Sequence, residues 1–327
     1  MDRKLERKQL KWAARDTMKE TRPRPVLVTL VYLLLTAGLS TVMGLFVTDP
    51  MSAFYQYIGM GYSEDIALYY ALAGGNTMLV VFLNILVGLF TMVVSFGFAA
   101  WALRRSRGEE AGYGTLLTGF SMAGRVIGLN LFIVLFSALW CLAVMIPAAI
   151  VIGVVVALVT GIGTSAAATA AGVILAVAVY IAALVLLVAI ILRYSMATYA
   201  LLDNPDAGIR AAVNRSKELM RGRRWFYFVM HLSFIGWYLL IGLLAAAAAG
   251  IAVLVSGAAG IAMAAQSGPA LASTVLAGGA VGTVLGFLLP LILEVWLTPY
   301  VQITDANFYG AMTEEKASAR QTCFPEL

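Results

Sequence analysis

Residues 171–192 read AGVILAVAVYIAALVLLVAIIL, a run of apolar and small residues with no charged side chain. A helix needs about 20 predominantly apolar residues to cross roughly 30 Å of hydrocarbon. The run therefore predicts a transmembrane helix. Arg193 follows it directly and is expected where the helix leaves the hydrocarbon.

The rest of the chain has the same character, because 61% of its 327 residues are hydrophobic and only 12% are charged. Soluble domains carry roughly 25% charged residues, so this chain has too few polar side chains to cover a water-facing surface. We predict an all-α polytopic membrane protein, a bundle of six transmembrane helices. The third run also allows one long tilted helix from 126 to 160. The six spans are placed at about 26–47, 78–103, 126–151, 171–192, 225–254 and 273–297.

The positive charges indicate the orientation of the spans. All 22 Lys and Arg residues lie in segments that the six spans place on one face, and the three other loops hold none. Because Lys and Arg concentrate on the cytoplasmic side, we expect both termini in the cytoplasm of a bacterial cell, with the chain in its cytoplasmic membrane. The expected organisation is a basic segment 1–25, a membrane domain 26–298 and a cytoplasmic tail 299–327.

The basic segment 1–25 predicts an amphipathic helix lying at the membrane interface. Its apolar stripe has helical spacing and consists of Leu10, Ala13, Ala14, Thr17 and Met18. Its cations are Lys8, Lys11, Arg15 and Lys19, and Trp12 is suited to the headgroup layer. Such a helix places its apolar side in the interface and its cations against anionic lipid.

A second amphipathic helix is predicted within the longest inner loop. Asn204 and Pro205 resemble an N-cap followed by a first-turn proline, and Gly222 is expected to end the helix. The apolar stripe is Ile209, Ala212, Val213, Ser216, Leu219 and Met220. The basic residues expected to face lipid or a protein partner are Arg210, Lys217, Arg221, Arg223 and Arg224.

Polar side chains within the spans are candidate functional or structural residues, because burying them in lipid is costly. They are His231, Glu294, Arg193 and Asn130. His231 and Glu294 fall at similar depth from the inner surface, which predicts that they pair; the alternative is a pair between Glu294 and Arg193. Asn84 and Asn130 are expected to form hydrogen bonds between helices.

Small residues suggest how the last two spans pack. Gly242, Ala246 and Gly250 in the fifth span, and Gly278, Gly282 and Gly286 in the sixth, have the spacing that permits close helix approach. A homo-oligomer through the same faces is the competing interpretation. The spacing does not decide between the two, because Gly and Ala are abundant throughout the chain.

Catalytic and cofactor motifs do not occur in the sequence. The single His and two Cys cannot supply a multi-His or zinc site, and no HExxH, Walker A or dinucleotide-binding motif is found. We expect no cofactor, no metal, no nucleic-acid partner and no enzymatic activity. Pro299 is expected to end the sixth span.

Six short motifs occur in order along the second half of the chain: RYSMA at 193–197, LDNP at 202–205, RSKELMRG at 215–222, LSFIGW at 232–237, LTPY at 297–300 and ANFY at 306–309. This set resembles the bacterial integral-membrane family called domain of unknown function nine-seven-five. The resemblance implies a helical membrane protein and brings no activity or substrate.

Two hypotheses for the function follow. The first is a non-enzymatic scaffold, accessory or envelope-maintenance component whose basic cytoplasmic face contacts anionic membrane lipid or a protein partner in the membrane or cytoplasm. The second is a transporter or channel for a small solute, lipid or peptide, which an inward-opening cavity lined by the four polar candidates would favour. An enzyme acting on lipid ranks third.

Overall fold

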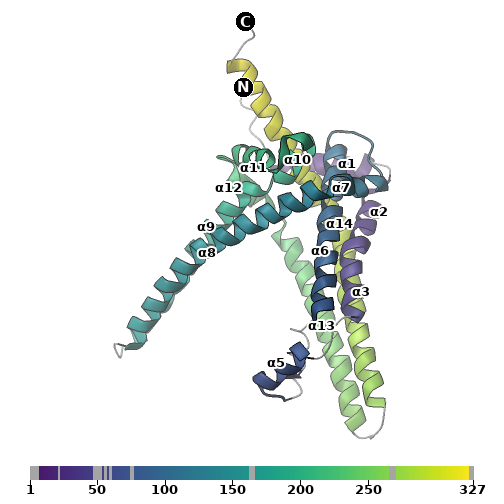
Figure 1. Ribbon diagram of the computed structural model, residues 1–327, viewed down its shortest axis with the longest axis vertical. Helices are drawn as coiled ribbons and strands as arrows, with labels where there is room; N and C mark the ends of the chain where they lie inside the picture. The colour runs from purple at the N-terminus through teal and green to yellow at the C-terminus, as the bar shows by residue number, and fades with distance from the viewer. Residues whose placement is uncertain are drawn as a thin grey trace. The chain divides into compact units, whose positions relative to one another are not determined.

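The structure, a computed structural model, consists of helices and the turns that join them (Figure 1). It describes residues 7–20, 23–46, 54, 57–58, 61–73, 77–161, 166–264 and 270–323. Within these residues, four helices are long and apolar enough to cross a membrane, and one bent helix pair makes a fifth if it counts as a single span. The all-α prediction and the expectation of several membrane-spanning helices are therefore confirmed, whereas the number six is not established.

The chain forms two compact units. Unit 1 comprises residues 1–123 and 233–310, and unit 2 comprises residues 124–232 and 311–327. The helices of unit 1 are α1 (Arg7–Glu20), α2 (Pro25–Leu33), α3 (Leu39–Phe46), α5 (Glu64–Ala73), α6 (Thr77–Ser106), α7 (Thr118–Ser121), α13 (Ile235–Ala264) and the part of α14 (Ala270–Cys323) that ends at Gly310. A π-helical turn, Leu34–Gly38, joins α2 to α3 and makes them one continuous rod.

The core of unit 1 depends on two glycines at which backbones meet. A Cβ placed on Gly97 of α6 would lie 1.9 Å from the carbonyl oxygen of Leu116, in the 3₁₀ turn Tyr113–Leu117. A Cβ on Gly119 of α7 would lie 2.3 Å from the carbonyl oxygen of Val93 in α6. Since only glycine lacks this atom, these two positions allow the connection after α6 to fold back onto α6.

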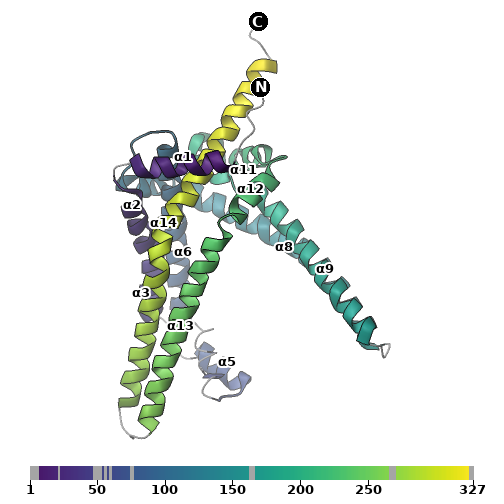
Figure 2. The same cartoon turned by 180° about the vertical axis from the view of Figure 1, so that it is seen from behind.

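The predicted amphipathic helix near the N-terminus is present as α1. Ala14 is completely buried, Leu10 and Met18 are half-buried, and Trp12 is exposed. The side-chain amide of Asn307 in α14 donates a hydrogen bond of 3.3 Å to the carbonyl oxygen of Leu10. α1 thus lies across α14, as Figure 2 shows.

The long helices of unit 2 are α8 (Ala123–Gly161) and α9 (Ala166–Ile191), which lie side by side (Figures 1 and 2). α8 is one helix that includes Pro147, so the structure adopts the long single helix rather than a third span ending at 151. A Cβ on Gly172 of α9 would lie 2.4 Å from a methyl carbon of Val159 in α8, which shows how tightly the two pack there. Elsewhere most of their large apolar side chains are exposed, as expected of surfaces that face lipid.

The shorter helices of unit 2 follow α9: α10 (Ala197–Asp203), α11 (Gly208–Leu219) and α12 (Arg224–Leu232). The prediction that Asn204 caps a helix starting at Pro205 is wrong. Asn204 makes no side-chain cap, Pro205–Ala207 form a short 3₁₀ turn, and Gly208 has φ +80°. The positive φ redirects the chain, so α11 begins only at Gly208. α11 ends at Leu219, and Gly222, which was predicted to stop the helix, lies in the turn that follows and has φ +79°.

The fifth and sixth predicted spans differ from expectation. The fifth is broken between α12 and α13, where residues 233–234 form a turn. The helix of the sixth span continues through Pro290 and Pro299 to Cys323, so Pro299 does not end it. A proline removes one backbone hydrogen bond from a helix and can bend it, but here the helix on either side continues.

The predicted packing of small residues between the last two spans is not tested by the described residues. Among them, a Cβ on Gly242 or Gly250 would meet no atom within 4 Å. The side chains at positions 278, 282 and 286 lie outside the described residues, and their part of the prediction stays open.

Candidate functional site: an arginine cluster beside α11

A buried serine holds the end of α9 against α11. The Ser216 hydroxyl donates a 2.7 Å hydrogen bond to the carbonyl oxygen of Arg193 and accepts a 3.2 Å hydrogen bond from the backbone N–H of Met196. Ser216 has no exposed surface, and it lies in the α11 stripe together with Ala212, Val213, Leu219 and Met220, which are all buried. The predicted apolar stripe is therefore confirmed, with its first member, Ile209, half-buried, and it packs on the protein itself.

This packing brings several arginines together. Arg193 lies in the 3₁₀ turn Leu192–Tyr194, which contacts both α11 and the start of α12. Arg221 and Arg223 lie in the turn between those two helices, and Arg224 begins α12. The positive charges of Arg193 and Arg221 both repel that of Arg224. We call these four residues the arginine cluster. They come from segments about 30 positions apart in the sequence.

The cluster carries more positive charge than its described neighbours neutralise. Arg223 forms an ion pair with Glu315 of α14. Arg215 and Glu218 form a separate pair within α11, at 3.7 Å. By contrast, Arg193 Nε, Arg223 Nη1 and Arg224 Nε are buried and have no hydrogen-bond partner among the described residues. Buried N–H groups normally find an acceptor, so an anion would satisfy this site.

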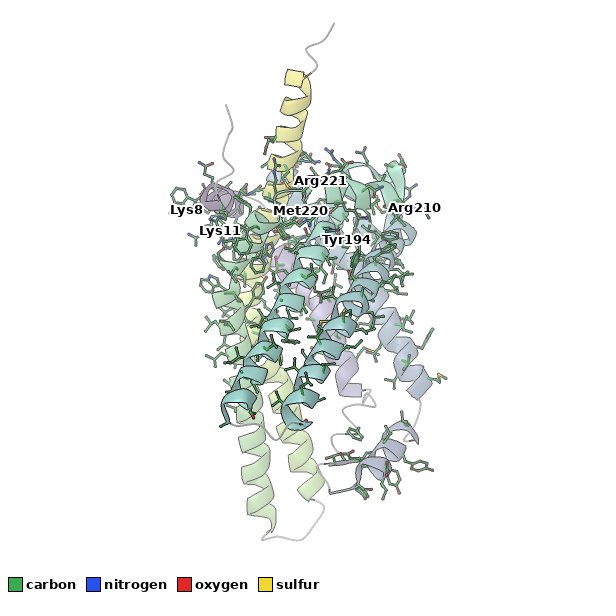
Figure 3. The ribbon with its side chains drawn as sticks, turned by 90° about the vertical axis from the view of Figure 1, so that its left-hand side faces the viewer. Lys8, Lys11, Tyr194, Arg210, Met220 and Arg221 are labelled. Carbon is green, nitrogen blue, oxygen red and sulfur yellow. The ribbon has the colours of Figure 1, made fainter. Side chains whose placement is uncertain are left out.

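The other two predicted basic residues do not belong to the cluster. The Lys217 ammonium lies 5.5 Å from the centre of the Tyr194 ring, within the range of a cation–π interaction. Arg210 is exposed near the first turn of α11, at the opposite end of the helix from Arg221 (Figure 3). Of the five predicted basic residues, Arg221, Arg223 and Arg224 belong to the cluster, whereas Arg210 stands apart.

The remaining polar candidates, His231 and Glu294, belong to different units. His231 of α12 contacts its own helix: its Nδ1 lies 3.3 Å from the Tyr227 carbonyl oxygen, and the two rings are 4.3 Å apart. Glu294 belongs to unit 1, whereas His231 and Arg193 belong to unit 2. Both predicted pairings of Glu294 therefore stay predictions.

The two asparagines within spans form bonds of a different kind from those expected. The Asn130 side-chain amide donates to the Val126 carbonyl oxygen at 3.0 Å, and the Asn84 amide donates to the Val80 carbonyl oxygen at 2.9 Å. Both bonds lie within single helices, where an amide can reach the carbonyl one turn earlier. The predicted bonds between helices are not among those of the described residues.

Glu315, the ion-pair partner of Arg223, was not predicted from the sequence. It lies 92 positions from Arg223, in a tail that has no motif beyond ANFY. No pattern of charge spacing joins two segments so far apart. Only the continuation of α14 past Pro299 brings the carboxylate to the turn between α11 and α12.

The chemistry of the cluster is that of anion binding. A guanidinium is planar, stays charged and presents a fork of N–H donors that matches phosphate and carboxylate oxygens. The described residues contain no group of three or more His, Cys, Asp or Glu side chains placed to hold a metal ion. Guanidinium groups gathered in this way offer donors of the kind that oxyanions accept from.

Comparison with known proteins adds the family. Neither a curated protein nor a solved structure matches the chain. The sequence profile of the family described as "Protein of unknown function (DUF975)" matches residues 1–316, nearly the whole chain. The resemblance seen in the ordered motifs is thereby confirmed, and the chain belongs to this family.

Proposed function

We propose that this protein is a non-enzymatic integral component of the bacterial cytoplasmic membrane, with six spans and both termini in the cytoplasm. It acts as a scaffold, accessory or envelope-maintenance protein, and its arginine cluster holds the phosphate of an anionic phospholipid. The orientation is supported by the location of every Lys and Arg on one face of the predicted topology.

The observation that carries the proposal is the set of buried guanidinium N–H groups without a described acceptor. Leaving such a donor unsatisfied costs about 1–3 kcal/mol. Phosphate oxygens would satisfy several of these donors at once and would also reduce the repulsion among Arg193, Arg221 and Arg224. A phospholipid supplies this group at the depth where helix ends and short surface helices meet the headgroups.

The test uses the purified full-length protein in a mild detergent after delipidation. Adding phosphatidylglycerol is expected to raise the thermal unfolding midpoint, because a ligand that binds only the folded state stabilises it. Phosphatidylcholine, whose headgroup has no net charge, is expected to have a much smaller effect. Arg224→Gln should abolish most of the difference between the two lipids.

Arg210→Gln is the matched control, because it removes the same charge from an exposed position on α11 outside the cluster. It should behave as the wild type does. Equal stabilisation by the two lipids, or equal loss of the phosphatidylglycerol effect in both variants, would contradict the proposal. Lipid co-purified with each variant, identified by mass spectrometry, gives an independent measurement.

A further inference from the structure

Unit 1 contains a pocket that shares no residue with the arginine cluster. Its volume is about 190 Å³. One part of its lining comes from α1, and the other comes from the turn before α13, from the start of α13 and from α14. The lining residues are Lys8, Lys11, Trp12, Arg15, Ser233, Phe234, Trp237 and Tyr300. We call this the α1 pocket.

The residues from α1 share one face of the helix. Lys8, Lys11, Trp12 and Arg15 are spaced at i, i+3, i+4 and i+7, so their side chains leave the helix on the same side. Figure 3 shows Lys8 and Lys11 on α1. The pocket lining thus has three cations and no carboxylate.

The cations lie against aromatic rings. The Lys11 ammonium lies 4.0 Å from the centre of the Phe234 ring and donates a hydrogen bond to the Ser233 hydroxyl. The Arg15 guanidinium lies 5.5 Å from the centre of the Tyr300 ring. Phe234 and Tyr300 are almost completely buried. Cation–π contacts of this kind position the charges but do not neutralise them.

The rings are themselves held by their neighbours. Phe234 and Tyr300 are packed edge to face with centroids 5.3 Å apart, and Trp296 lies 5.3 Å from Tyr300. Trp296 also lies 5.6 Å from Trp237, which lines the pocket. This chain of aromatic contacts joins α13 to α14 and makes that side of the pocket a preformed surface.

The pKa of Lys11 also indicates that the pocket lining is positively charged. Burial, followed by the neighbouring charges of Arg15 and Arg7, lowers the pKa of the Lys11 ammonium below its usual value of 10.5. An ammonium with a neighbouring carboxylate would show the opposite shift. The pocket therefore concentrates positive charge that a bound anion would stabilise.

We propose that the α1 pocket binds the phosphate monoester headgroup of a membrane lipid, the headgroup of phosphatidic acid. A monoester carries close to two negative charges at neutral pH, which suits three cations better than the single charge of a diester. The pocket is smaller than the roughly 300–1,000 Å³ of sites for drug-sized ligands, so it favours a headgroup without a further substituent.

The aromatic lining favours a lipid over free phosphate. Trp12 and Trp237 have relative exposures of 65% and 40%, and such amphipathic rings occur where headgroups meet the acyl chains. Free phosphate has no apolar part with which these rings could interact. A lipid would place its phosphate among the three cations and its glycerol and chains against the rings.

The test measures binding of soluble short-chain lipids to the full-length protein in detergent by isothermal titration calorimetry. Dihexanoyl phosphatidic acid is expected to bind more tightly than dihexanoyl phosphatidylglycerol, and inorganic phosphate should bind weakly at the same concentration. Lys11→Gln should weaken phosphatidic acid binding by about tenfold or more, because a charge-assisted bond is lost. Lys11→Arg should retain most of the binding.

Lys19→Gln is the matched control. Lys19 lies one turn beyond Arg15 on the same face of α1, outside the pocket, where it forms an exposed ion pair of 3.2 Å with Asp16. Its replacement removes the same charge and should leave the binding unchanged. Equal weakening by Lys11→Gln and Lys19→Gln, binding of phosphatidylglycerol as tight as that of phosphatidic acid, or an equal affinity for inorganic phosphate would each overturn the inference.

The outcome is separable from that of the proposed function, because Arg224→Gln alters the arginine cluster and leaves the α1 pocket intact. Loss of the phosphatidylglycerol effect in Arg224→Gln with unchanged phosphatidic acid binding supports two independent sites. If phosphatidic acid binding falls in Arg224→Gln and persists in Lys11→Gln, the phosphatidic acid site is the arginine cluster. That result overturns the inference about the α1 pocket and leaves the proposed function standing.

Discussion

Gly97→Ala tests the backbone contact on which unit 1 depends. The added Cβ would lie 1.9 Å from the Leu116 carbonyl oxygen, whereas real Cβ atoms essentially never come closer than 3.0 Å to another heavy atom. The two segments must therefore separate by about 1 Å. The obstacle is backbone, which cannot move aside by changing a rotamer, and Leu116 itself is 1% exposed.

The expected cost follows from two opposing effects. Overpacking of a close contact typically costs about 1–3 kcal/mol, and a contact this short lies at the upper end. Alanine in a helix is favoured over glycine by about 1 kcal/mol. The net loss of unfolding free energy for Gly97→Ala is therefore about 2 kcal/mol, taking both values together.

Gly88→Ala is the control within the same helix. Among the described residues, a Cβ at Gly88 meets no atom within 4 Å. The gain in helix propensity should therefore leave the variant equal to the wild type in stability or above it. Gly119→Ala, whose Cβ would lie 2.3 Å from the Val93 carbonyl oxygen, should be destabilised as well. The double variant of Gly97 and Gly119 should lose less than the sum, because both changes separate the same two segments.

The assay is unfolding in mixed detergent micelles, followed by tryptophan fluorescence. Trp101 has no exposed surface and stacks on Phe98 at 5.3 Å, so it reports on the region where α6 meets the turn after it. If Gly97→Ala is as stable as Gly88→Ala, α6 and the 3₁₀ turn do not meet at Gly97 and the reasoning is refuted.

Three further predictions concern α11, the turn after it, and α1. Ser216→Ala should lower the unfolding free energy by about 1–3 kcal/mol, because the buried N–H of Met196 loses its acceptor. The same micelle assay measures this loss, and an unchanged unfolding free energy would contradict the hydrogen bonds assigned to Ser216. Gly222→Ala should cost about 1–2 kcal/mol, because φ +79° is unfavourable for any residue with a Cβ; a denaturation midpoint equal to the wild type would contradict it. The unfolded chain binds the Lys11 proton more tightly than the folded protein, so stability should rise with pH between the lowered folded-state pKa of Lys11 and its usual value of 10.5. Lys11→Met should reduce that slope in unfolding measured as a function of pH, and an unchanged slope would show that Lys11 titrates normally.

The predictable part of the fold is the part governed by composition and by local periodicity. Hydrocarbon thickness sets a minimum length for an apolar run, which is why four predicted spans coincide with long helices. The buried stripe of α11 was predictable because its spacing depends only on the helical repeat. Positions where a single residue redirects the chain were less predictable: Asn204 resembled a cap, but the positive φ of Gly208 places the helix start further on.

The candidate sites also have a part that local sequence predicts and a part that depends on distant residues. The predicted basic residues Arg221, Arg223 and Arg224 do lie together, because they are neighbours in one turn. Their association with Arg193 depends on the buried hydroxyl of Ser216, and their ion pair depends on Glu315 in a distant helix. The cations of α1 were visible in the sequence, whereas Phe234 and Tyr300 gave no sign of lying beside them.

The sequence by itself determined that this protein consists of apolar helices with its positive charge gathered in a few segments, because transfer to lipid and the helical repeat act on consecutive residues. The tertiary structure decided which charged side chains lie close together and which aromatic or acidic side chains they contact. Glycines at Gly97 and Gly119 set how closely backbones approach, and the continuation of α14 past Pro299 sets which distant side chains reach the surface helices. Such contacts join residues tens to hundreds of positions apart, and a local pattern cannot specify them.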